Sequence, residues 1–228
     1  MESFVSLALR MQKSLKTPTS HIIIPRLLLS LLIAELRNRI TDPREVNREL
    51  HKLGVWVGSR CMAVLAKRKD LEKVHPRDQN PEGTARGLSV YAKAAWYLFA
   101  GHFPTIETKI IELEKGFLIR GVLKPDPGKD HIFKGIVSPT GISSLYLAAG
   151  AYEAATSFAF KTLEIDNLWF SLWRPREEGL VGFYIWHEAP LNLAVEEIKR
   201  EYPDFFDVVS LEDSDRFLKE YLGVRILR

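Results

Sequence analysis

The chain is short of cysteine. Its 228 residues include one, Cys61, so an internal disulfide is excluded and nothing points to an oxidising compartment. One thiol and six scattered histidines also provide no pair of ligands at the spacing of a zinc site. Cys61 falls on the apolar side of a predicted helix, which favours a buried and unreactive thiol.

Long apolar runs are missing as well. A membrane-spanning helix needs roughly 20 apolar residues, but the most apolar segment, residues 22–34, is interrupted by Pro25 and Arg26. The first residues lack the apolar core and cleavage site of a signal peptide. We therefore expect a cytosolic protein. A basic amphipathic helix predicted at residues 3–16 leaves a peripheral contact with a membrane open.

The chain also has little excess charge of either sign. Its 32 basic and 29 acidic residues give a net charge of +3. Without a basic stripe, no nucleic-acid partner is expected. The sequence has no dinucleotide fingerprint, phosphate-binding loop or nucleophile elbow, and His187-Glu188 lacks the second histidine of a metalloprotease. The acidic residues after Ser210 fit a helix N-terminus better than a metal site. We expect no enzyme and no cofactor.

What the chain does have is helical periodicity with excess apolar surface. The helix predicted at residues 25–39 is apolar over most of its circumference and must be covered on more than one side. Asp42, Pro43 and Glu45 predict the start of the next helix, whose apolar stripe runs to residue 65. Gly54 and Gly58 lie inside it and each costs roughly 1 kcal/mol relative to alanine. The close approach of another backbone is the expected compensation.

The rest of the chain alternates strands and helices. A helix is predicted at 84–100, two strands around the Lys115-Gly116 turn, and an alanine-rich helix at 143–160. A second hairpin, at 168–172 and 181–185, is apolar on both faces and is joined by a polar link at 174–179. Helices at 191–200 and 213–222 follow. This order predicts an α+β fold, with helices packed on a twisted antiparallel sheet. We divide the chain into an N-terminal amphipathic segment (1–19), an α/β domain (20–188) and a C-terminal helical extension (189–228).

Two stretches resemble a known family. Residues 46–60 contain Leu53-Gly54, Val57-Gly58 and Arg60 at the spacing of the second-helix signature of the small subunits of the transport protein particle, TRAPP. Residues 92–101 resemble the third helix of that family, which carries a lysine and ends in a glycine turn. With the apolar helix before them and the alanine-rich helix after the strands, the resemblance covers residues 20–188.

The resemblance implies a non-catalytic scaffold. In that family, four main helices pack on a twisted sheet, and subunits dimerise through the first two helices and join into a vesicle-tethering complex. The complex promotes nucleotide exchange on a Rab-type small GTPase through a composite surface. This chain departs from the pattern in two ways: residues 70–87 contain no cysteine, so acylation is not expected, and the tail after residue 189 is longer.

We therefore predict a homo- or heterodimer interface on the first two helices. Its residues are the apolar face of the first and the glycine-bearing side of the second: Leu28, Leu29, Leu32, Ile33, Leu36, Leu50, Leu53, Gly54, Val57 and Gly58. An alternative from another class is a sensor domain of the bacterial vinyl-reductase type, which shares this fold and binds a small apolar ligand. The cysteines of the zinc site found in some of those sensors are missing here.

Overall fold

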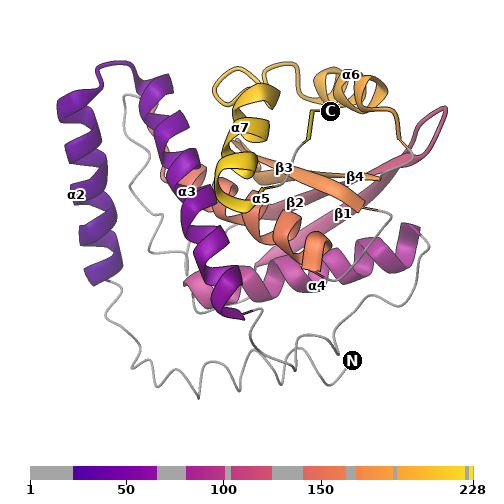
Figure 1. Cartoon of the computed structure of the whole chain (residues 1–228), viewed down its shortest axis with the longest axis horizontal. Helices are drawn as coiled ribbons and strands as arrows, with labels where there is room; N and C mark the ends of the chain where they lie inside the picture. The colour runs from indigo at the N-terminus through magenta and orange to yellow at the C-terminus, as the bar shows by residue number, and fades with distance from the viewer. Residues whose placement is uncertain are drawn as a thin grey trace.

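The computed structural model describes residues 23–65, 81–100, 104–124, 141–162, 168–186, 189–223 and 226–227. Within these ranges it contains six helices and four strands (Figure 1). The predicted helix at 3–16, the side chain of Cys61 and the His187-Glu188 pair lie outside the described residues. In chain order the elements are α2 (Ile23–Arg39), α3 (Pro43–Leu65), α4 (Pro81–Ala100), β1 (Thr105–Glu112), β2 (Phe117–Lys124), α5 (Leu145–Thr162), β3 (Leu168–Arg176), β4 (Gly179–Trp186), α6 (Leu191–Glu201) and α7 (Leu211–Leu222).

The four strands form one antiparallel sheet in the order β1-β2-β4-β3. The two outer pairs are the predicted hairpins. β2 and β4 lie side by side at the centre, with Val122 opposite Val181. The first hairpin turns at Gly116, whose φ of +75° suits a residue without a Cβ. The predicted α+β class, with helices packed on an antiparallel sheet, is confirmed.

Both faces of the sheet are covered over its central strands, while the edge strand β1 stays mostly exposed. Helices α4 and α5 pack on one face, over Ile119 and Tyr184. Helices α6 and α7, with the segment between them, pack on the other, over Val122 and Phe183. In Figure 1, α4 lies below the sheet and α6 above it. Strand β4 is therefore buried on both sides, which explains why its sequence is apolar at consecutive positions instead of alternating.

Helices α3 and α5 approach each other unusually closely. A Cβ atom added to Gly54 would overlap the backbone of Leu147, and one added to Gly58 would overlap the backbone of Ala151. From the other side, a Cβ on Gly150 would overlap the carbonyl of His51. The close packing offsets the cost of glycine inside a helix. The predicted approach of another backbone is confirmed, and that backbone belongs to the same chain.

The helix starts follow the capping chemistry of the sequence. At α3, Asp42 accepts a 2.9 Å hydrogen bond from the Arg44 amide, while Glu45 lies beside Arg48 instead of reaching back to the cap. At α7, Ser210 and Asp213 form both halves of a capping box. The acidic residues after Ser210 therefore stabilise a helix N-terminus, as predicted.

The residues after 188 are built into the core rather than appended to it. Phe205, Phe217 and Ile226 are at most 1% exposed and belong to the same apolar cluster as Leu50 of α3. Asp215 holds the end of the described chain, because one of its carboxylate oxygens accepts hydrogen bonds of 2.6 and 2.9 Å from the amides of residues 226 and 227. The segment that we treat as an extension in the sequence thus completes the hydrophobic core.

Candidate protein–protein interface

Exposed apolar side chains gather on helices α2 and α3. Among the described residues, the exposed large hydrophobic side chains are Leu28, Leu31 and Trp56, at 61%, 57% and 42%. Single exposed apolar residues are ordinary, but a group of them on adjacent helices indicates an interaction surface. Helix α2 makes its main contact with α3 and stands apart from the sheet at the left of Figure 1.

The ten residues predicted for the dimer interface fall into three groups. Leu28 is exposed. Four are half-buried: Leu32, Leu36, Leu53 and Val57. Five are buried within the chain itself: Leu29, Ile33, Leu50, Gly54 and Gly58. The two glycines face α5 and the three apolar side chains belong to the main core, so these five are already covered without a partner. Only the exposed and half-buried positions are free to contact a partner.

Three of these predicted positions, Leu28, Leu32 and Leu53, together with the exposed Leu31 and Trp56, make up the surface that we call the hairpin face. Leu28 lies one helical turn from Leu31 and Leu32, and Leu53 lies one turn before Trp56, so each set is continuous along its helix. The two helices are joined by a short connection at 40–42. Leu28 and Trp56 are a similar number of residues from that connection, so they lie at the same level of the hairpin.

The sequence-based prediction missed Leu31 and Trp56. A signal for Trp56 exists, because it lies two residues from both Gly54 and Gly58. Two residues turn a helix by about 200°, so a tryptophan at this position points away from the glycine-packed side. No such signal exists for Leu31, since leucines surround the helix there and the sequence does not distinguish buried from exposed ones.

A buried ionic cluster lies on the other side of α3. One carboxylate oxygen of Glu153, on α5, accepts a 2.8 Å hydrogen bond from the Arg174 guanidinium and a 3.2 Å bond from the Trp173 amide. His51 of α3 places its Nε2 atom 3.5 Å from the same oxygen. The side chains of His51, Glu153 and Arg174 are all fully buried. The cluster thus joins α3, α5 and β3 through a single carboxylate.

Arg174 extends this cluster to α7. Its Nε and Nη2 atoms donate to the carbonyl of Val209 at 3.2 and 3.0 Å, and Nη2 also donates to the Ser214 hydroxyl at 2.8 Å. The sequence predicts a polar link at 174–179, but its first three residues belong to the strand instead. Strand β3 continues to Arg176, and Arg174 is buried because its donors are satisfied inside the fold.

The charges of the cluster follow from burial and pairing. Burial lowers the pKa of His51 below 6.5, and the attraction of Glu153 only partly opposes this, so the ring is neutral at pH 7. Burial alone raises the pKa of Glu153, but the charge of the Arg174 guanidinium outweighs it and holds that pKa at about 2. The resting state is therefore an Arg174–Glu153 ion pair beside a neutral histidine. None of the three side chains has exposed surface through which a substrate could reach it.

In the part of the chain that the structure describes, no three histidine, cysteine or acidic side chains are grouped to hold a metal ion. None of the described helices has the length and apolar character required to cross a membrane. Comparison with known proteins finds no matching family and no matching curated protein. The candidate site is therefore defined by geometry alone, as the hairpin face.

Proposed function

We propose that this chain is a non-catalytic scaffold subunit of the TRAPP type, which assembles with another subunit through the hairpin face. The observation that carries the proposal is the concentration of Leu28, Leu31 and Trp56, the exposed large hydrophobic side chains of the described residues, on two adjacent helices. An exposed apolar surface of this kind loses free energy in water and gains it on association. In a complex of that type, the subunit contributes to a composite surface that acts on a Rab-type small GTPase.

The arrangement of the hairpin supports an assembly role. Leu29 and Ile33 anchor α2 to the core at 7% and 9% exposure, while Leu28 and Leu31 on the same helix remain exposed. Helix α3 is held firmly by α5 through its glycines. The hairpin face is therefore presented on a fixed backbone, and preorganisation of this kind reduces the entropy lost on binding.

The primary test is the solution mass of the full chain, measured by light scattering over a range of concentrations. We expect a dimer that dissociates in Leu28→Glu, with a dissociation constant at least about 100-fold higher, because a carboxylate would be buried without a partner. Leu28 is 61% exposed, so the substitution should leave the fold of the monomer intact. Circular dichroism and thermal unfolding verify this.

The matched control is Ser30→Glu. Ser30 is exposed on the same helix and lies two residues from Leu28, on the opposite side of α2. The same charge at this position should leave the dimer unchanged. A wild-type chain that is monomeric at every concentration, or equal effects of the two substitutions, contradicts self-assembly through the hairpin face. A small apolar molecule retained in native mass spectrometry of such a monomer would favour the ligand-sensor alternative.

A further inference from the structure

The ionic cluster connects α3, which carries part of the hairpin face, to α7. His51 lies on α3 between Leu50 and Leu53, one and a half turns before Trp56 of the hairpin face. Ser214 lies in the first turn of α7. The shared carboxylate of Glu153 lies between them, with Arg174 as the bridge to α7. A change in the charge of the cluster therefore acts on α3 and α7 together.

The surroundings of His51 disfavour the second proton that would give its ring a positive charge. The groups facing it are Glu153 from α5, Arg174 from β3 and Asp213 from α7. The ring of Phe217, also from α7, lies 6.4 Å away. Neither ring nitrogen has a hydrogen-bond partner, and the same is true of the Oε1 atom of Glu153. The carboxylate oxygen nearest the ring is already engaged by Arg174.

We propose that this cluster is an acid-sensitive latch, in which a proton taken up by His51 competes with Arg174 for Glu153, loosens α7 and weakens assembly through the hairpin face. Protonation adds a second buried cation beside a single carboxylate, and a buried unpaired charge is costly. Release of α7 moves Phe217 away from the His51 imidazole and lets water reach that imidazole. The hold of Arg174 on Val209 and Ser214 weakens as its carboxylate partner turns toward the imidazolium.

The direction of the pH effect follows from linkage. In the closed state the pKa of His51 is below its ordinary value, so opening is accompanied by proton uptake once the pH falls below about 6.5. The equilibrium constant for opening then rises by up to about tenfold per pH unit, until the pH reaches the closed-state pKa. The pKa of Glu153 is also lowered by folding, but that carboxyl contributes only below about 4.5. Between about pH 6.5 and 4.5, the pH dependence of opening therefore comes from His51.

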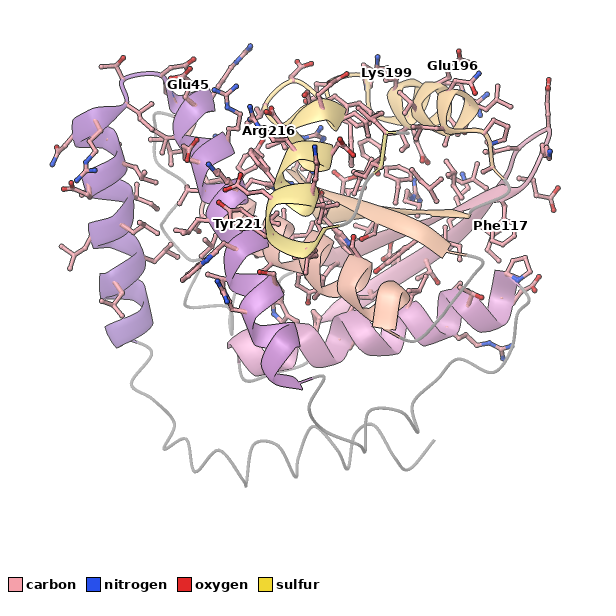
Figure 2. The ribbon with its side chains drawn as sticks, in the orientation of Figure 1. Glu45, Phe117, Glu196, Lys199, Arg216 and Tyr221 are labelled. Carbon is pink, nitrogen blue, oxygen red and sulfur yellow. The ribbon has the colours of Figure 1, made fainter. Side chains whose placement is uncertain are left out.

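The link to assembly rests on the proposed function and on the position of α7. Helix α7 packs along α3. Tyr221 near its end lies beside α3 in Figure 2, within electrostatic reach of Glu49. Lys52 of α3 also lies over the Phe217 ring, 5.9 Å from its centre. Loosening α7 therefore removes lateral support from the helix that carries Leu53 and Trp56.

The test uses the full chain between pH 7.5 and 5.0. Hydrogen exchange of the amides in 211–222, corrected for intrinsic rates, measures the opening of α7, and light scattering measures the mass. In the wild-type chain we expect opening to increase by up to about tenfold per unit below pH 6.5, with dissociation of the dimer over the same range. In His51→Gln, which has no titrating ring, both responses should be absent. Ser30→Glu, the control variant used above, keeps His51 and should respond as the wild type does.

The two proposals fail in different ways. A chain that is monomeric at every pH but shows acid-induced opening of 211–222, abolished by His51→Gln, supports the latch and contradicts the dimer. A dimer in which opening of α7 is unchanged between pH 7.5 and 5.5 overturns the latch alone. The same acid response in His51→Gln as in the wild type also overturns it.

A second variant and a direct titration keep the test decisive if His51→Gln does not fold. Ser214→Ala removes one contact of Arg174 and keeps every titratable group, so opening should increase at all pH values with the same slope. Nuclear magnetic resonance of the His51 ring supplies the other measurement. The latch requires the ring to stay neutral through pH 6.5 while α7 is closed; a ring that titrates near 6.5 with α7 still protected contradicts it.

Discussion

Replacing Arg174 with methionine is expected to lower the free energy of unfolding by about 3–5 kcal/mol, the usual cost of leaving a buried charge without its partner. Methionine keeps an unbranched apolar stem but lacks the guanidinium that pairs with Glu153. It also leaves the Val209 carbonyl without its donor. Urea unfolding at pH 7.5, followed by tryptophan fluorescence, measures the difference.

Two further variants separate the buried pair from arginine in general. Arg216→Met removes an exposed arginine whose partner is Asp213, and an exposed pair of this kind is worth about 0–1 kcal/mol. The double variant Glu153→Leu with Arg174→Met removes both buried charges and should recover part of the loss, because no charge is then left unpaired. Equal losses in Arg174→Met and Arg216→Met would show that the Glu153 pair does not hold the fold together.

Replacing Gly150 with alanine is expected to cost about 2–3 kcal/mol, even though alanine gains about 1 kcal/mol in helix propensity. The added methyl group would overlap the carbonyl of His51, which is a backbone atom and has no side-chain rotation by which to move aside. Helices α3 and α5 must therefore separate, and α3 carries half of the hairpin face. Thermal unfolding measures the loss of stability.

The control for this prediction is Gly121→Ala. The nearest atoms to a Cβ at Gly121 are 3.7 Å away, on Trp173 and Tyr184, which is ordinary van der Waals distance. The substitution should change stability by no more than about 0.5 kcal/mol. Gly121→Ala as damaging as Gly150→Ala would mean that the loss reflects the general cost of a methyl group in the core, and the close α3–α5 approach would not be its cause.

The fold follows from local sequence patterns to a large extent. The alternation of apolar residues around the Lys115-Gly116 turn predicts the first hairpin, and the consecutive apolar residues of β4 predict a strand buried on both faces. Asp42 and Pro43 place the start of α3 at the observed residue. These features depend on residues close together in the chain, which is why sequence reasoning finds them.

The candidate site depended on contacts that the sequence does not contain. Gly54 and Gly58 predict a close backbone, but the pattern is the same whether that backbone lies in α5 or in a second subunit. Arg174 follows an apolar strand and precedes Pro175, which is typical of a surface link, since arginine is seldom fully buried. Its burial depends on Val209 and Ser214, more than 30 residues later. Glu153, a carboxylate within a predicted alanine-rich helix, is a local signal that the sequence analysis did not use.

The anchoring of residues 217–226 in the main core has a consequence for synthesis on the ribosome. Phe217, Leu218 and Ile226 share a cluster with Leu50 and Val55 of α3, yet they are made after every other described element. Until translation reaches them, the part of the apolar surface of α3 that α7 covers stays exposed. Domains fold as units while the chain emerges, so this one stays open to chaperones and proteases until residues 217–226 have emerged. A frameshift shortly before residue 217 should therefore be about as harmful as an early one.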